Sequence, residues 1–267
     1  MGPYTLHVAP LSTRDLRELS ALPWADAPAL LAHVRWCLCT PRAVVLKVAA
    51  HAGPVGVACG YRHEGSAWIT HLEILPSDRA AGAGSLLLLH LLQVFDGTGC
   101  AVVRVCAPPA DAAFFGRFGF RAEGAINTYE RHNFHEAARP EVVALEPEHL
   151  MGLWHLDRTI TGEDRRALLM EQLYLGQVFV ERGRVRGALL PLNGDGLVIA
   201  ESDAVGFELL RWLLPLRTHI HAPATNEALH AHLTGLGNTA SISAIRLVRG
   251  TPSSWRPELV FAGGGWG

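Results

Sequence analysis

The chain has 267 residues, of which 49% are hydrophobic and 18% charged, and 23 basic against 25 acidic side chains leave a formal net charge of -2. At roughly 150 residues per domain, this length predicts about two domains with ordinary hydrophobic cores. The near balance of charge excludes a polybasic nucleic-acid binder, and the hydrophobic content excludes a disordered chain. A globular protein with no nucleic-acid partner is expected.

The five cysteines are odd in number and never spaced as C-x-x-C, so neither a disulfide framework nor a zinc site is indicated. The N-terminus lacks the cationic and long apolar regions of a signal peptide. The most apolar run, Leu86–Leu92, is interrupted by His90 and falls far short of the roughly 20 residues that span a bilayer. We therefore expect a cytoplasmic protein with reduced thiols and no membrane segment.

Hydrophobic periodicity and turn residues predict a mixed α/β unit in the first half of the chain. Three strands separated by short glycine-containing turns are expected to form an antiparallel meander, and a helix follows them after a glycine-rich loop. The predicted strands are Thr5–Val8, Ala43–Ala50, Val55–Tyr61, Ala67–Leu75, Ala101–Cys106 and one that begins at Phe120. The predicted helices are Ser12–Leu22, Ala27–Leu38, Gly84–Phe95 and Ala110–Phe118.

The segment Phe134–Pro140 has no apolar periodicity and predicts a linker, with a domain boundary near residue 138. The element order then restarts, which predicts two copies of one topology, residues 1–138 and 139–267; a single large α/β domain is the alternative. The second set of predicted strands lies near Val142 and at Gln177–Glu181, Val185–Leu192, Leu197–Ala200, Thr218–His221 and Ser241–Val248. Its predicted helices are Pro147–His155, Gly162–Leu173, Val205–Leu214 and Asn226–Leu236.

A glycine-rich loop after the predicted strand Ala67–Leu75 carries the clearest chemical pattern. Gly82 and Gly84 permit close backbone approach, and the first amides of the following helix point at whatever sits there. The partial positive charge of the helix N-terminus, with Arg79 beside it, suits a pyrophosphate. The dinucleotide pattern fails because Leu87 occupies its third glycine position, and the ATP-binding pattern fails for lack of G-K-[ST].

The loop does match the pattern R-x-x-G-x-G, formed by Arg79, Gly82 and Gly84, which is the acetyl-CoA pyrophosphate loop of the GCN5-related N-acetyltransferases (GNATs). Downstream, the run Asp111–Phe120 resembles the second signature of this family, a short helix that ends in Gly-Phe. The chain therefore resembles the GNAT superfamily over residues 4–132. The resemblance implies an α/β (α+β) fold of tandem GNAT-like domains, each with a mixed, mostly antiparallel sheet flanked by helices.

The resemblance also implies acetyl-CoA as the co-substrate and no metal. Under it, the backbone at Leu72 and Ile74 pairs with the pantetheine arm, and Phe115 lies at the cofactor. The pyrophosphate would be held by the residues of the loop and the first helical turn, namely Arg79, Ala80, Ala81, Gly82, Ala83, Gly84 and Ser85. The other interpretation of the loop is a helix N-terminus that merely turns the chain, with Arg79 in solvent.

Acetyl transfer to an amine needs the free lone pair. An amine with a pKa of about 10.4 is protonated at pH 7, and its deprotonation costs about 4 to 5 kcal/mol. Glu73 is the first candidate for the base, directly or through water, with His71 on the same strand face; a half-buried carboxylate paired with an arginine is the other interpretation of Glu73. The family's tyrosine acid is replaced by Phe115, and Tyr129, Cys106 or water are the alternative proton donors.

The second half departs from the pattern at the position equivalent to the pyrophosphate loop. The run Ala200–Gly206 holds the carboxylates Glu201 and Asp203 and no glycine pair, which would repel a pyrophosphate. We expect one cofactor site, formed by residues 1–138. Residues 139–267 are predicted to be a degenerate GNAT-like domain that completes the acceptor pocket or braces the first domain.

Two further groups of polar residues leave alternatives open. The charged segment Leu156–Arg166 either faces a cleft between the domains or is a solvated helix start. The close pair His219 and His221 could chelate a metal from one strand face, but no third ligand of the usual spacing accompanies it. Scattered surface histidines are the favoured interpretation.

Together these patterns predict an N-acetyltransferase that transfers an acetyl group from acetyl-CoA to a primary amine on a small molecule or peptide. The alternative is a non-catalytic acyl-CoA-binding sensor or scaffold, which the substitution at Phe115 and the degenerate second half favour. The sequence identifies neither the acceptor nor the oligomeric state, and a homodimer paired through an exposed edge strand stays open.

Overall fold

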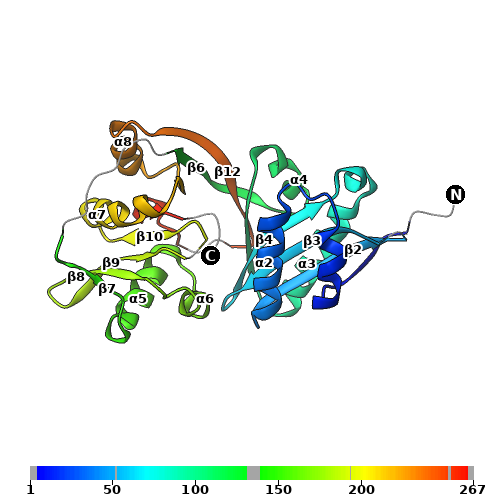
Figure 1. The fold of residues 1–267 in the computed structure, drawn as a ribbon, viewed down its shortest axis with the longest axis horizontal. Coiled ribbons are helices and arrows are strands. Elements are labelled where there is room, and N and C mark those ends of the chain that lie inside the picture. The colour runs from blue at the N-terminus through cyan, green and yellow to red at the C-terminus, as the bar shows by residue number, and fades with distance from the viewer. Residues whose placement is uncertain (1–4, 52, 131–138, 193, 252–253, 264–267) are drawn as a thin grey trace. The chain divides into compact units, whose positions relative to one another are not determined.

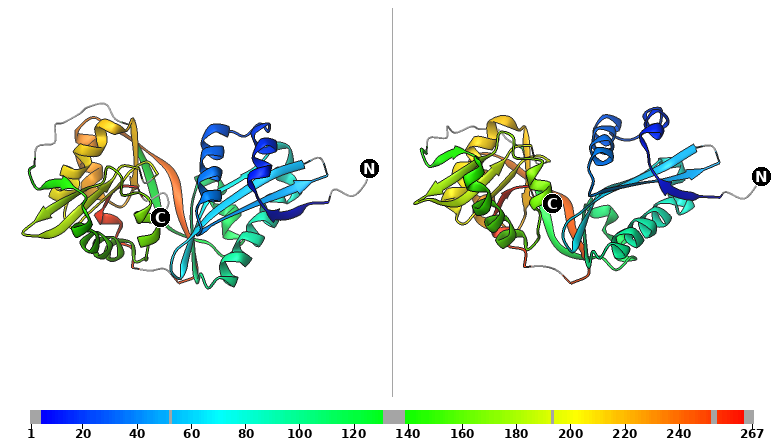
Figure 2. Two further views of the ribbon diagram at one scale, coloured as in Figure 1. Left: turned by 60° about the horizontal axis from the view of Figure 1, so that its bottom comes forward. Right: turned by 90° about the horizontal axis from the view of Figure 1, so that it is seen from below.

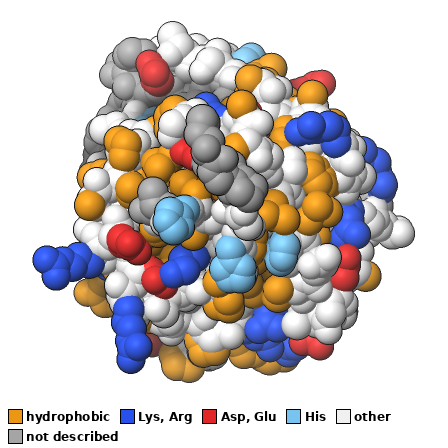
Figure 3. Space-filling view, turned by 90° about the vertical axis from the view of Figure 1, so that its right-hand side faces the viewer, with side chains coloured by type: hydrophobic (Ala, Val, Ile, Leu, Met, Phe, Trp, Pro, Cys, Tyr) orange, Lys and Arg blue, Asp and Glu red, His pale blue; other side chains and the backbone are white. Residues whose placement is uncertain are grey.

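A computed structural model describes residues 5–51, 53–130, 139–192, 194–251 and 254–263 (Figure 1). Its backbone contacts divide the chain into two compact units, residues 1–104 and 105–267. None of the helices within the described residues combines the length and apolar character needed to cross a membrane. On the face of the molecule shown in Figure 3, basic and acidic side chains are interspersed rather than gathered into a patch of one sign.

The first unit is built on an antiparallel meander. Its strands pair in the order β1 (His7–Pro10), β2 (Ala43–Ala50), β3 (Gly53–Arg62) and β4 (Ser66–Ile74). Helices α1 (Leu16–Ser20) and α2 (Ala27–Cys39) cover one face, and α3 (Ala83–Gly97) covers the other (Figure 2). Strand β3 is buried along nearly its whole length because both of its faces are covered.

Local sequence explains how these helices form and pack. Asp26 caps α2 by accepting a hydrogen bond from the Ala29 amide at 3.2 Å, and a proline stands in the first turn. The apolar side of α2 packs against Val45 and Val57 of the sheet. On the opposite face, a Cβ at Gly60 would collide with the ring of Phe95 from α3, so the glycine lets this helix approach the sheet closely.

The second unit begins within β5 (Val102–Ala107) and holds two groups of paired strands. Strand β6 (Arg121–Glu130) pairs antiparallel with both β12 (Thr239–Arg249) and β11 (His219–Pro223). A five-stranded antiparallel sheet has the order β13 (Val260–Ala262), β10 (Leu197–Ala200), β9 (Arg184–Leu190), β8 (Gln177–Glu181) and β7 (Val142–Ala144). The helices are α4 (Ala112–Gly116), α5 (Leu150–Thr161), α6 (Arg166–Met170), α7 (Asp203–Leu213) and α8 (Glu227–Gly235).

The order of elements confirms the predicted repeat. The run β7, α5, α6, β8, β9, β10, α7, β11, α8, β12 follows the same order as β1, α1, α2, β2, β3, β4, α3, β5, α4, β6. The expected boundary near residue 138 lies within 131–138, outside the described residues, so the limits 1–138 and 139–267 stay a prediction. The compact units divide earlier, after Arg104, because β6 ends the first repeat in sequence but is hydrogen-bonded to strands of the second.

Two expectations for the second half were wrong. The helix expected over Pro147–His155 continues as α5 to Thr161 and ends at Gly162, whose φ of 70° places it in the left-handed conformation typical of a helix C-terminus. The helix expected over Gly162–Leu173 is therefore limited to α6 (Arg166–Met170). Strand β13 was not expected, because three residues near a glycine-rich end are too few to show periodicity.

Two residues of the charged segment Leu156–Arg166 form a buried ion pair. Asp157 is 1% exposed and Arg165 is 4% exposed, and the Arg165 Nε donates to Asp157 Oδ2 at 3.2 Å while Nη2 donates to Oδ1. Burial raises the pKa of Asp157, although the Arg165 guanidinium opposes that shift. The interpretation of this segment as a solvated helix start is therefore wrong for these two residues.

Candidate active site

The glycine-rich loop has the geometry that its sequence predicts. Strand β4 ends at Ile74, a 3-10 turn spans Pro76–Ala81, and Gly82 adopts φ 80° and ψ 6° directly before α3. Only glycine takes this left-handed conformation at little cost. The N–H groups of the first helical turn have no partner within the helix, and Gly82 has no side chain that could cap them. The loop therefore presents backbone donors at the positive end of a 15-residue helix.

The space beside this turn is open. A Cβ built on Gly82 would meet no atom within 4 Å. Arg79, Ala80, Ala81 and Gly82 are exposed, Gly84 and Ser85 are half-buried, and Ala83 is buried against the core. An anion with negatively charged oxygens can approach the donors, and a guanidinium lies three residues before the glycine. Their use by a pyrophosphate stays a prediction.

Strand β4 carries a bulge immediately before the predicted catalytic residues. Cys59 of β3 pairs with His71 and Gly60 pairs with Ile69, so Thr70 is an extra residue on β4 without a partner position. Bulges re-aim side chains and are common beside active sites. Beyond the bulge, His71 and Glu73 are two residues apart and therefore lie on the same face of the strand. The ring of His71 packs against His33 of α2, so this is the face that α2 covers. The structure thus keeps these two candidates together.

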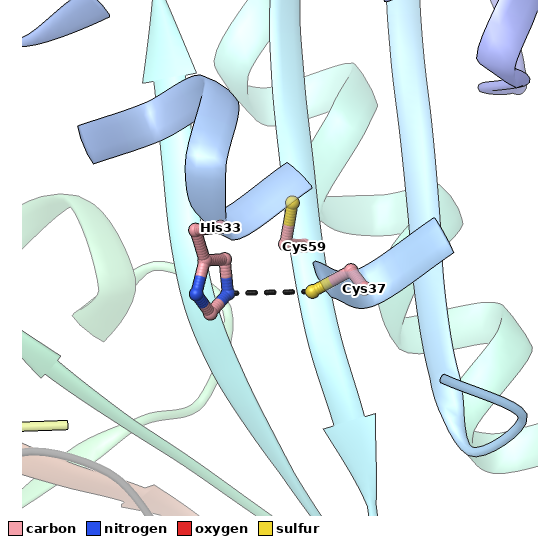
Figure 4. Close-up of side chains that lie close together, drawn as sticks. All are labelled: His33, Cys37 and Cys59. Atoms are coloured by element: carbon pink, nitrogen blue, oxygen red, sulfur yellow. Dashed lines mark hydrogen bonds between the residues drawn. The ribbon is translucent and has the colours of Figure 1, made fainter. Parts of the chain in front are cut away.

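The imidazole of His33 and the thiols of Cys37 and Cys59 form a cluster (Figure 4). His33 and Cys37, one helical turn apart on α2, lie beside Cys59, and the His33 Nε2 is 3.3 Å from the Cys37 Sγ. The same nitrogen is 2.7 Å from the Thr70 hydroxyl. The rings of His33 and His71 pack with their centroids 4.2 Å apart. Sequence reasoning missed the cluster because it searched for C-x-x-C spacing, whereas the i, i+4 pair on α2 was a readable signal.

Burial and hydrogen bonding perturb the titration of this cluster. A hydrogen bond from Cys59, opposed by burial and reinforced by His33, lowers the pKa of Cys37 to about 6. The same pairing, with burial, raises the pKa of Cys59 well above its usual value. Burial, and then the charge of His33, lowers the pKa of His71 to about 4. The His71 imidazole is therefore neutral at pH 7.

The remaining candidates lie in the second unit. Tyr129 of β6 is 1% exposed; its hydroxyl accepts a hydrogen bond from Asn127 Nδ2 at 3.2 Å and lies 3.3 Å from His230 Nδ1. Burial raises the pKa of Tyr129. Phe115 of α4 is 4% exposed and packs edge-on against Phe120. Both side chains belong to packed interiors, and their roles in proton donation and cofactor binding stay predictions.

Cys106 is a poor alternative acid. Burial raises the pKa of this thiol to about 12, with the Arg246 guanidinium opposing the shift. A group with this pKa gives up its proton at pH 7 only at considerable cost. Burial raises the pKa of Tyr129 as well, so Tyr129, Cys106 and water all stay predictions for the proton donor.

The equivalent loop of the second repeat is closed by the chain itself. Ser202 precedes α7, and the neighbouring Glu201 forms an ion pair with Arg186 at 2.5 Å. A Cβ on Gly206 in the first turns of α7 would collide with the ring of Phe261 from β13. Where the first repeat has open space beside a left-handed glycine, the second has carboxylates and a packed strand.

Strand β13 also occupies the edge of β10, the counterpart of β4. Val198 pairs with Ala262 and Ile199 pairs with Val260. The Gly263 amide donates to the His221 carbonyl of β11 at 2.8 Å. The backbone groups that correspond to those expected to bind pantetheine are therefore used within the protein.

The histidine pair of β11 has a third neighbour that sequence spacing did not show. Asp195 lies with His219 and His221 in a group whose ligand atoms are all within 4.8 Å of one another. The His221 Nε2 is 3.1 Å from Asp195 Oδ2, and this hydrogen bond lowers the pKa of Asp195. No third ligand of the usual sequence spacing was expected, and Asp195, far from the pair in sequence, comes close to it only through the fold; Asp195 and His219 are both exposed.

Comparison with known proteins identifies the fold. No family model and no curated protein matches the chain. A solved structure from Pyrococcus horikoshii, described as an acetyltransferase, superposes with a TM-score of 0.83 at 16% identity over 98% of this chain and 96% of that one. A tandem GNAT protein from the clavulanic acid biosynthesis pathway gives 0.59 at 15% identity over 94% and 100%. A GNAT from Kribbella flavida gives 0.57 at 15% identity over 92% and 71%.

These similarities show that the chain adopts a tandem GNAT fold, as the sequence predicts. The observed elements agree with this result, since each repeat combines a mostly antiparallel sheet with flanking helices. At identities of 13 to 16% these superpositions show the fold alone and leave the reaction to the residues of the site.

Proposed function

We propose that this tandem GNAT-fold protein is an acyl-CoA-dependent N-acyltransferase that transfers an acetyl group from acetyl-CoA to a primary amine. The observation that carries the proposal is the loop after β4. It combines Arg79, a left-handed Gly82 beside open space, and the uncapped start of α3. This arrangement offers a pyrophosphate both backbone donors and positive charge. The backbone at Leu72 and Ile74 would then pair with the pantetheine arm.

The reaction follows from the thioester and the strand face beyond the bulge. The acceptor amine loses a proton to Glu73, directly or through water, and its nitrogen attacks the thioester carbonyl carbon. The new C–N bond forms, the C–S bond breaks, and coenzyme A leaves as a thiolate, which takes up the second proton that the nitrogen releases as it becomes an amide. Positioned bases contribute roughly 10²- to 10⁴-fold to such steps. His71 lies on the same face and would help to shape the acceptor pocket.

The proposal includes one cofactor site per chain. The second repeat lacks the glycine pair and carries the carboxylate of Glu201 where an anion would have to bind. Strand β13 also occupies the edge of β10. Repulsion by the carboxylate and the loss of free backbone groups both disfavour a second acyl-CoA. The second repeat would instead brace the first or contribute to the acceptor pocket.

A calorimetric titration with acetyl-CoA, followed by a thiol-release assay over a panel of amines, tests the proposal. Binding of one equivalent and acceptor-dependent release of free thiol are expected. Binding with no release for small amines, polyamines or peptide termini would favour the sensor alternative, which the buried Phe115 in place of a tyrosine supports. Absence of binding to the folded protein would refute both functions, and two equivalents would refute the closure of the second repeat.

A further inference from the structure

The imidazole and thiol cluster of the first unit has the composition of a metal site. His33, Cys37 and Cys59 each offer one ligand atom, and these atoms all lie within 4.8 Å of one another. Tetrahedral zinc with Zn–S bonds of about 2.3 Å and Zn–N bonds of about 2.05 Å sets ligand atoms roughly 3.6 to 3.8 Å apart. The 3.3 Å between His33 Nε2 and Cys37 Sγ needs only a few tenths of an ångström to reach this spacing.

The ligands come from rigid elements. His33 and Cys37 are one turn apart on α2, so their side chains lie on one side of the helix. Cys59 lies at the centre of β3, in register with His71 of β4. Cys37 is 2% exposed and Cys59 is fully buried, both within the apolar cluster between α2 and the sheet. Ligands held by packed helices and strands are positioned more precisely than ligands on loops.

The chemistry of the set selects the metal. Two thiolates and one imidazole favour a soft or borderline divalent ion, and zinc is the commonest ion for such a set. Three protein ligands leave one tetrahedral position for water. The Thr70 hydroxyl, 2.7 Å from His33 Nε2, would give up this hydrogen bond when the nitrogen binds the ion. His71 packs on His33, and its buried Nδ1 has no hydrogen-bond partner among the described residues.

We infer that His33, Cys37 and Cys59 form a zinc site that ties α2 to β3 beside the β4 bulge. On binding, each thiol gives its proton to solvent and its sulfur donates an electron pair to the ion, with no change in oxidation state. The inference does not depend on acyl-CoA binding, since the site lies among side chains of the first unit away from the pyrophosphate loop in sequence. The expectation of a protein without metal would then be wrong.

Metal binding can be measured without any enzymatic assay. The reduced protein is stripped with a chelator and titrated with cobalt(II) and with zinc in competition. One equivalent per chain is expected, with the intense thiolate-to-cobalt charge-transfer absorption that oxygen and nitrogen ligands do not give. Cys37→Ala and Cys59→Ala should each weaken zinc binding by more than the roughly 10- to 100-fold that loss of an outer partner costs. Cys39→Ala, an exposed cysteine on the same helix, is the matched control and should bind like the wild type.

Alanine is used because a buried free cysteine behaves as a small apolar residue. If either variant fails to fold by circular dichroism, the wild type decides: stoichiometric zinc should raise its unfolding temperature, because the ion binds the folded state only. Absence of stoichiometric binding to the reduced wild type would overturn the inference. So would a charge-transfer band that survives in the Cys37→Ala, Cys59→Ala double variant, or a disulfide between these cysteines in protein purified without oxidant.

Discussion

Replacing Gly82 with glutamate is the sharpest test of the pyrophosphate loop. Gly82 has a φ of 80°, and a Cβ atom added to it would lie more than 4 Å from any neighbouring atom. A side chain therefore has room in the open space beside the first amides of α3. A carboxylate about 4 Å from a phosphate oxygen is repelled by roughly 1 kcal/mol in water and roughly 4 kcal/mol at an effective dielectric constant of about 20. Since about 1.4 kcal/mol is tenfold in affinity, the Kd for acetyl-CoA should rise about 5- to 700-fold.

The control for Gly82→Glu must carry the same backbone strain. Gly65, in the turn between β3 and β4, has φ 74° and equally open space. A non-glycine residue in this conformation costs roughly 1 to 2 kcal/mol at either position, so both variants should lose similar stability in thermal unfolding. Calorimetric titration should then separate them, with Gly65→Glu binding acetyl-CoA like the wild type. Equal affinity for Gly82→Glu and Gly65→Glu would refute the assignment of the loop.

Three further outcomes follow from the site and the second unit. Glu73→Gln should lower acceptor-dependent thiol release by roughly 10²- to 10⁴-fold with the Kd for acetyl-CoA unchanged; an unchanged rate would remove Glu73 from the role of base. Asp157→Asn leaves Arg165 charged in the core without its partner, so denaturant unfolding should show a loss of about 3 to 5 kcal/mol; a loss below about 1 kcal/mol would contradict the buried ion pair. His221 lowers the pKa of Asp195, so the carboxylate stabilises the fold above its unfolded pKa of about 3.9 and loses this effect as the pH falls through the lower folded value. Because the Asp195 side chain is 55% exposed, Asp195→Asn should cost less than about 1 kcal/mol at pH 6, and a cost that grows below pH 4 would be the wrong sign.

The fold was predictable from local patterns where strands and helices are long or sharply bounded. Strands Ala43–Ala50, Gln177–Glu181 and Leu197–Ala200 were expected over the residues that they occupy, because apolar β-formers are bounded there by turn residues. The repeat was readable because the element order restarts. The pairing of β6 with β11 and β12 was not, since strand partners are chosen by tertiary packing and many orders satisfy the same periodicity.

Some features of the candidate site were also predictable from local sequence, and others depend on the folded structure. The geometry of the loop from Arg79 to Ser85 was predictable because it depends on consecutive residues and on the left-handed Gly82. The Cys59 ligand was not, because β3 must first pack under α2 before this cysteine meets His33 and Cys37. The bulge at Thr70 depends on the register between β3 and β4, so the local sequence does not predict it.

Strand β13 gives a physical reason why acyl-CoA binding is expected in the first repeat and not in the second. A pantetheine arm and a β-strand both need the free N–H and C=O groups along one strand edge, so a repeat that uses this edge internally cannot offer it to acyl-CoA. In the second repeat Val198 and Ile199 are paired with β13, and Asn226 donates from its side chain to the Val260 carbonyl at 3.0 Å. Phe261 is fully buried where Gly206 of α7 leaves room for its ring. Acyl-CoA binding there would require β13 to leave a packed core, and truncation of a buried phenylalanine alone typically costs about 3 to 5 kcal/mol. In the second repeat this strand edge is occupied by β13, so the loop at Gly82 is the place where cofactor binding should be measured first.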